Sequence, residues 1–181
     1  MRFFWWGSVI WATVLLTACY PNQPAVFASR VPCTVYFVMD GDTFSCDLNN
    51  NGRIEKPEEH IRLLGVDAPE TRHSAKARRR QQAQQAVDEP MAQQAKAWLQ
   101  HHIQQKTVWL LWDVKQHDPY GRSLAWLYTS SQAQEPLNVK MVREGMAAAL
   151  FLGPNRLFEA ETHQAETEAF EAQRGIWSSK P

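Results

Sequence analysis

The sequence RLLGVDAPET occupies residues 62–71. It runs from an apolar strand pattern into a polar segment, so Arg62, Asp67 and Glu70 fall at or near the end of a strand. A rigid sheet presents functional groups to solvent at its strand ends and turns. Two other segments of clustered charge have the same setting, namely Asp40-Gly41-Asp42-Thr43 and Asp118-Pro119-Tyr120-Gly121-Arg122.

The strands and helices around these segments follow from apolar periodicity and turn residues. Strands are expected at about residues 31–39, 42–48, 60–66, 107–115 and 123–129. A helix that Pro90 can begin carries apolar residues at spacings of three and four, and two more are expected over about residues 136–149 and 156–174. The first of these two is expected to stop near Gly145 or near Gly153-Pro154. The polar stretch from Thr71 to Asp88 is expected to be a surface loop or a frayed helix.

The order is three strands, a helix, two strands and two helices, which predicts the α+β class. Five strands with a helix between the third and the fourth is the order of an OB-type barrel, although periodicity alone would also allow another α+β sheet. The chain has 181 residues, enough for one domain and a targeting segment, and we expect the domain to span residues 31–178.

The charged residues of the three segments have the chemistry of a phosphodiester-cleaving site. Asp42, Asp67 and Glu70 offer hard oxygen ligands that suit calcium or magnesium. Arg62 and Arg122 offer planar forks that each match two phosphate oxygens. Each residue also has a structural alternative: Asp42 as a turn cap, Arg62 paired with Asp67, and Arg122 paired with Asp118.

The three segments resemble the staphylococcal nuclease family, in the same order and at comparable separations, from about Val35 to Trp177. The resemblance implies a five-stranded OB-fold barrel with three helices that hydrolyses DNA or RNA with calcium. It also implies roles for individual positions: Asp42 and Asp67 as carboxylate calcium ligands, Ala68 as a backbone carbonyl ligand, Glu70 as the general base for water, Arg62 and Arg122 on the scissile phosphate, and Asp40 at the turn that orients the first ligand.

The family pattern is not matched on the nucleotide-stacking side. Phe151 and Gly153 stand near the place of two family tyrosines, and the segment before Pro154 is one residue shorter. Phe151 can stack on a base but lacks a hydroxyl, and a core aromatic is the alternative. A basic cluster follows Glu70 and either tracks phosphates or forms a solvated loop; its members are Arg72, Lys76, Arg78, Arg79 and Arg80.

Residues 47–58 fit the spacing of an EF-hand calcium loop, a feature that the family resemblance does not need. The oxygen ligands would be the side chains of Asp47, Asn49, Asn51 and Glu58 and the backbone carbonyl of Arg53, with Gly52 at the sixth position. Strands are expected on both sides in place of helices. We expect a second, structural calcium in the hairpin, and the alternative is a polar Asn-Gly turn.

The N-terminus predicts export. Arg2 precedes an apolar run, Phe3 to Leu16, that is short for a membrane span and typical of a signal peptide. The run leads into Leu16-Thr17-Ala18-Cys19, which resembles a bacterial lipobox. Residues 1–18 are then the signal peptide, Cys19 carries lipid and residues 19–30 form a tether. The expected product is an envelope lipoprotein, periplasmic or anchored at the outer membrane; cleavage after Ala28 and an uncleaved anchor are alternatives.

An oxidising compartment permits disulfides, and Cys33 and Cys46 fall nearly opposite each other about the Asp40-Gly41 turn. We expect a bridge between them, against the alternative of two buried thiols. The 19 basic and 19 acidic residues balance, so net charge does not support a nucleic-acid partner. A monomer is expected. The competing functions are a non-catalytic OB-fold nucleic-acid-binding module and a lipid-tethered calcium-binding structural protein.

Overall fold

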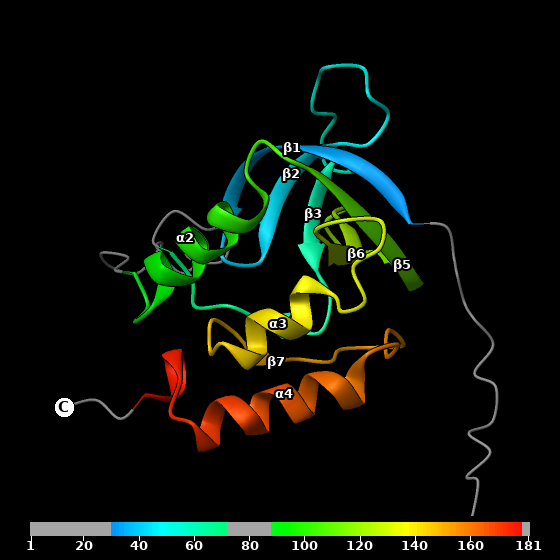
Figure 1. The fold of residues 1–181 in the computed structure, drawn as a ribbon. Helices are drawn as coiled ribbons and strands as arrows, with labels where there is room; N and C mark the ends of the chain where they lie inside the picture. The colour runs from blue at the N-terminus through cyan, green and yellow to red at the C-terminus, as the bar shows by residue number, and fades with distance from the viewer. Residues whose placement is uncertain (1–29, 72–87, 179–181) are drawn as a thin grey trace, which may run out of the picture.

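The computed structural model describes residues 30–71 and 88–178 (Figure 1). Five strands form a closed barrel in the order β1-β2-β3-β6-β5. They are β1 (Val31–Asp40), β2 (Thr43–Asp47), β3 (His60–Leu63), β5 (Thr107–His117) and β6 (Ser123–Tyr128). The helices are α2 (Ala92–Ile103), α3 (Leu137–Arg143) and α4 (Glu159–Glu171), followed by the short 3₁₀ helix η2 (Gly175–Trp177). The predicted α+β, five-stranded OB-fold barrel with three helices is confirmed.

The barrel interior collects the apolar residues that alternate along the strands. Val35, Phe44, Ile61, Leu110 and Leu127 are each 0–1 % exposed. Fully burying a side chain of this size stabilises the fold by about 1.5–3 kcal/mol. The barrel is closed by a parallel pair between β3 and β6, which joins segments far apart in the sequence.

Helix α2 covers the turn between β1 and β2. Ala95, Leu99 and Ile103 recur every four residues on one helical face and are fully buried. Gly41 lies beneath this face, where a Cβ would come within 2.7 Å of the Cβ of Ala68 and 3.1 Å of the Cβ of Ala95. The absence of a side chain at position 41 therefore lets the helix approach the turn between Asp40 and Asp42.

Helices α3 and α4 pack side by side on one side of the barrel (Figure 1). Helix α3 ends near Gly145, the earlier of the two predicted stops, where Gly145 takes a positive φ of 70° and packs directly against the backbone of Arg174 and Gly175. The expected strand over residues 60–66 is also divided. Gly65, at φ 71°, ends β3 and starts a separate strand β4 (Val66–Asp67), which pairs with β7 (Ala148–Ala149).

The predicted bridge between Cys33 and Cys46 is confirmed. It joins β1 to β2 with a Cα–Cα distance of 5.8 Å, and both residues are buried. Cys46 lies next to Asp47, so the bridge holds the start of the segment that connects β2 to β3. That segment, residues 48–59, is called the insert below; it projects from the barrel at the top of Figure 1.

The predicted signal peptide, Cys19 and the tether up to residue 29 lie outside the described residues. So do Arg72 and the rest of its basic cluster. Among the helices of the described part, none has the length and apolar character needed to cross a membrane.

Candidate active site

The barrel brings the three charged segments to one place. Asp42 lies in the turn between β1 and β2, and its carbonyl oxygen accepts a hydrogen bond from the backbone N–H of Leu63 at 2.9 Å. In the antiparallel pair of β2 and β3, Thr43 is the partner of Arg62. Arg122 immediately precedes β6, and its Nη1 donates to Oγ1 of Thr43 at 3.4 Å. Thr43 is therefore next to both arginines, as the strand partner of Arg62 and as the acceptor of a hydrogen bond from the guanidinium of Arg122.

Arg62 contacts two of the predicted metal ligands. Its Nη1 forms a salt bridge with Oδ2 of Asp42, and its Nη2 lies 3.3 Å from Oδ1 of Asp67. Asp42 is buried, and its carboxylate also accepts hydrogen bonds from the N–H of Ala68 at 3.1 Å and the hydroxyl of Thr43 at 2.9 Å. The pairing of Arg62 with Asp67 that the sequence allowed is thus present, and Asp42 shares the same guanidinium.

Asp40 adds a second buried carboxyl group at this turn. Its Oδ1 accepts hydrogen bonds from the N–H of Gly41 at 3.0 Å and of Thr71 at 3.4 Å, whereas the buried Oδ2 has no partner within the described residues. Burial, together with the negative charges of Asp42 and Glu70, raises the pKa of Asp40 to about 7, although the two hydrogen bonds act to lower it. The turn therefore concentrates negative charge in a poorly solvated place.

Glu70 is held through its backbone by a residue that the sequence analysis missed. The N–H of Glu70 donates to Oε2 of Glu89 at 3.1 Å, and the N–H of Glu89 donates to the carbonyl of Glu70 at 2.9 Å. These two hydrogen bonds hold Glu70 and Glu89 next to each other. The only sequence signal for Glu89 is an acidic residue directly before Pro90, which is too common to single it out.

Arg122 is oriented by its own turn. Its Nε donates to Oδ2 of Asp118 at 2.6 Å, which is the ion pair that the sequence allowed. The other oxygen of Asp118 accepts the backbone N–H groups of Tyr120 at 2.8 Å and Arg122 at 3.0 Å. Asp118 therefore fixes the turn and the guanidinium together.

Phe151 packs on the apolar cluster of Leu64, Leu111, Trp126 and Tyr128. Its ring centroid lies 6.3 Å from that of Trp126 and 5.4 Å from that of His163. This is the core packing that was the alternative for Phe151, and its stacking on a base stays a prediction. The neighbouring Leu150 and Leu152 are the exposed apolar side chains of this segment.

The insert has the hydrogen bonds of a tight polar loop. Oδ1 and Oδ2 of Asp47 accept the N–H groups of Asn51 at 3.1 Å and Gly52 at 2.8 Å. Oδ1 of Asn49 accepts the N–H of Asn51 at 3.0 Å, and Oδ1 of Asn51 accepts that of Arg53 at 2.9 Å. The predicted side chains of positions 47, 49 and 51 thus face the same short stretch of backbone.

The last predicted residue of this loop, Glu58, has an acidic neighbour that faces inward. Glu58 is exposed, whereas Glu59 is 3 % exposed and accepts the N–H groups of Leu48 at 2.8 Å and Glu55 at 2.6 Å. Glu59 faces inward because it directly precedes β3, where its carbonyl accepts the N–H of Cys46. Among residues 30–71 and 88–178, no three acidic, His or Cys side chains are grouped closely enough to hold a metal by themselves.

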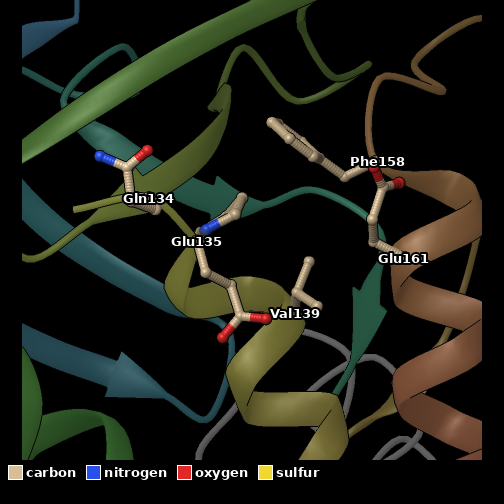
Figure 2. Close-up of a pocket in the computed structure, with 6 residues that line it drawn as sticks. Gln134, Glu135, Val139, Phe158 and Glu161 are labelled. Carbon is tan, nitrogen blue, oxygen red and sulfur yellow. The ribbon is translucent and has the colours of Figure 1, made fainter. Parts of the chain in front are cut away.

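A small pocket lies elsewhere, between the start of α3 and the start of α4 (Figure 2). Its lining residues are Gln134, Glu135, Pro136, Val139, Phe158 and Glu161. None of the clustered Asp and Arg residues described above lines it, so it is separate from the candidate active site.

Residues 60–179 match the family model described as staphylococcal nuclease homologue. The chain is 30 % identical to a thermonuclease of Staphylococcus hyicus over 94 % of both proteins. It is 34 % identical to a thermonuclease of Staphylococcus intermedius, over 77 % of this chain and 72 % of the relative. It is 32 % identical to endonuclease Htp3 of Saprolegnia parasitica (strain CBS 223.65), over 80 % of this chain and 68 % of the relative.

Proposed function

Because the chain belongs to the staphylococcal nuclease family and is a metal-dependent hydrolytic nuclease, we propose that it hydrolyses phosphodiester bonds of DNA and RNA with calcium at the Asp42–Arg62 site. The observation that carries the proposal is the placement of Arg62 and Arg122 next to Thr43, beside Asp42. Two guanidinium groups next to hard oxygen ligands are suited to an anionic phosphodiester and a divalent cation.

The residues at the turn fit a calcium ion. Asp42, Asp67 and the carbonyl of Ala68 would supply its oxygen ligands. The unpartnered Oδ2 of Asp40 and the raised pKa of its carboxyl group favour a cation nearby, since both reflect negative charge without full compensation. Calcium, when bound, supplies Lewis-acid stabilisation of the phosphate charge.

Each of the other side chains of the site has its own role in the reaction. Arg62 and Arg122 bind the non-bridging phosphate oxygens, so that their positive charge offsets the charge that builds up during attack. Glu70 takes the proton of the attacking water as the new P–O bond forms and the bond to the leaving oxygen breaks. Glu89 keeps the backbone of Glu70 in place. Each donor or proton-transfer group in such a site is typically worth on the order of 10² to 10⁴ in rate.

A cleavage assay tests this function. The purified full chain is incubated with denatured DNA and with RNA, in calcium or in chelator, beside Glu70→Gln and Arg122→Ala. Arg156→Ala is the matched control, because Arg156 is an exposed arginine that pairs with Glu159. We expect cleavage by wild type and control in calcium only. Intact DNA and RNA after incubation with the wild type in calcium would refute the proposal.

We further propose a structural calcium in the insert, bound by Asp47, Asn49, Asn51 and the carbonyl of Arg53, with Glu59 in place of Glu58. The support is the spacing of these oxygens and the inward position of the Glu59 carboxylate. Calcium should raise the melting temperature of the Glu70→Gln variant. The rise that calcium causes in the Asp47→Asn variant should be smaller. An equal rise in both proteins would exclude this second site.

Residues 1–30 support a proposal on location. We propose that the nuclease is exported and anchored to the cell envelope by lipid on Cys19, and that it acts as a monomer. Radiolabelled palmitate should be incorporated into the wild type and not into Cys19→Ala. Incorporation into both would exclude Cys19 as the lipid site, and sedimentation of the detergent-solubilised protein checks the monomer.

A further inference from the structure

The insert lies directly against the turn that carries Arg122. Gly121, at φ 81°, faces the ring of Pro57, and a Cβ at Gly121 would lie 2.5 Å from Cγ of Pro57. This is closer than two carbon atoms can approach, so the ring takes the space where any other residue would place its side chain. The contact joins residues of the insert to the residue next to Arg122.

A hydrogen bond joins the insert to the other neighbour of Arg122. The hydroxyl of Ser123 donates to the carbonyl of Glu58 at 2.6 Å, and Ser123 is 3 % exposed. Ser123 is the first residue of β6 and the partner of Ile61 in the parallel pair with β3. The insert therefore contacts the chain immediately before and immediately after Arg122.

The insert is itself tied to the barrel at both ends. The buried carboxylate of Glu59 accepts the N–H groups of Leu48 and Glu55, and the backbone of Glu59 pairs with Cys46. Cys46 is bonded to Cys33 of β1. Contacts that the insert makes with the Arg122 turn are therefore anchored on the barrel.

Arg122 itself stands outside regular structure. It lies before the first residue of β6, its side chain is 27 % exposed, and its close ion-pair partner, Asp118, belongs to the same turn. Lys56 of the insert and Arg122 also act on the same imidazole: burial lowers the pKa of His60, and both positive charges lower it further. The position of the turn relative to the barrel thus depends on what packs against it.

We propose that the insert positions Arg122 for phosphate binding, through the packing of Pro57 on Gly121 and the hydrogen bond from Ser123 to Glu58. The inference rests on the proposed function, since it assigns the insert a part in that same site. Pro57 and Ser123 are positioning residues, because they act through the guanidinium of Arg122 and touch no reacting atom. A displacement of about 1 Å at such a group can cost up to 10²-fold in rate.

The test compares Ser123→Ala and Pro57→Ala with Ser45→Ala. Ser45 is a matched control, because it is a fully buried serine of the same barrel whose hydroxyl has no partner within the described residues. We expect kcat to fall about three- to tenfold in the first two variants, with KM within about twofold, and both to be unchanged in the control. In an Arg122→Ala background, Ser123→Ala should cause no further loss of kcat. An equal fractional loss in that background would overturn the proposal.

A second readout does not need catalysis. The Nε–H of Arg122, observed by NMR, should exchange with solvent faster in Ser123→Ala and Pro57→Ala than in the wild type and Ser45→Ala. Unchanged exchange in the first two variants would refute the positioning role. If the wild type cleaved no nucleic acid, the proposed function would fall while this exchange measurement still decided the role of the insert.

Discussion

The two arginines of the candidate site are held in different ways. Arg62 belongs to β3 in the middle of the barrel wall, and its guanidinium is shared by Asp42, from the turn between β1 and β2, and by Asp67, which follows in the same charged segment. Arg122 lies in a turn, and its closest acid, Asp118, is four residues away in the same turn. The difference indicates that long-range strand pairing places one phosphate-binding group, whereas local turn geometry and the insert place the other.

The largest expected effect is a loss of kcat, and it should be similar for the two arginines. Arg62→Ala and Arg122→Ala should each lower kcat by about 10² to 10⁴, because each removes a charged donor to the phosphate. Steady-state cleavage of a defined oligonucleotide measures the loss. A loss below tenfold for either arginine would remove that residue from the proposed site.

Removal of the disulfide should lower the stability of the fold. It should leave the catalytic contributions of both Arg62 and Arg122 unchanged. Cys33→Ser combined with Cys46→Ser should reduce the free energy of unfolding by about 3 kcal/mol, given a sequence separation of 13 residues. Urea denaturation measures this loss. Well below the melting temperature kcat should stay within about twofold, and a larger drop would show that the bridge also shapes the site.

Stability should then separate the two arginines. Arg62→Ala leaves the buried Asp42 beside Asp67 without its cation and should cost about 2 kcal/mol in chelator. Arg122→Ala should cost under about 1 kcal/mol, because Asp118 keeps two backbone N–H partners. Equal losses in the free energy of unfolding would mean that the turn depends on the guanidinium of Arg122 as much as the barrel wall depends on that of Arg62.

Glu89 tests whether the general base is positioned as firmly as the arginines. Glu89→Ala should lower kcat about tenfold, because the N–H of Glu70 loses its acceptor. Glu89→Gln should keep most of the activity, since an amide oxygen can accept the same hydrogen bond. Asp88→Ala, at the neighbouring position, is the control. Similar losses in the Gln and Ala variants would point to the charge of Glu89 and away from its hydrogen bond.

The smallest effect should come from a charged pair remote from both arginines. Hydrogen bonds from Gln164 and Arg143 lower the pKa of Glu168. A lowered carboxyl pKa stabilises the fold above the ordinary value of 4.5, and this stability is lost as pH falls through the folded-state pKa. Glu168→Gln should therefore lower the melting temperature by about 1–3 °C at pH 7, and the difference from wild type should vanish in acid. A constant difference at all pH values would contradict this.

Much of the fold could be predicted because strand and helix periodicities are local. The division of the strand at Gly65 could not, since it depends on the ring of Trp126, whose Cη2 would lie 2.6 Å from a Cβ at this position. The choice of Gly145 over Gly153 as the end of α3 similarly depends on the backbone of Gly175, thirty residues after Gly145. Such contacts between distant segments leave no periodic signal.

The candidate site shows the same limit. The sequence pointed to the charged residues of three segments, because clustered charge at strand ends is unusual and the family resemblance fixed their order. Glu89 escaped notice because its side chain meets the site through a hydrogen bond to a backbone N–H, which leaves no pattern in the sequence. The inward position of Glu59 beside the exposed Glu58 depends on the exact start of β3, since adjacent side chains near a strand start point in opposite directions.

The parallel pair of β3 and β6 has a consequence for folding kinetics. It joins Ile61 to Ser123, Arg62 to Leu124 and Leu63 to Ala125, so its formation closes a loop of about 60 residues and is expected late. Arg62 and Arg122 can face the same phosphate only after that step. Recovery of nuclease activity during refolding should therefore report the time at which the barrel closes, and a chain kept unfolded would leave nucleic acids intact.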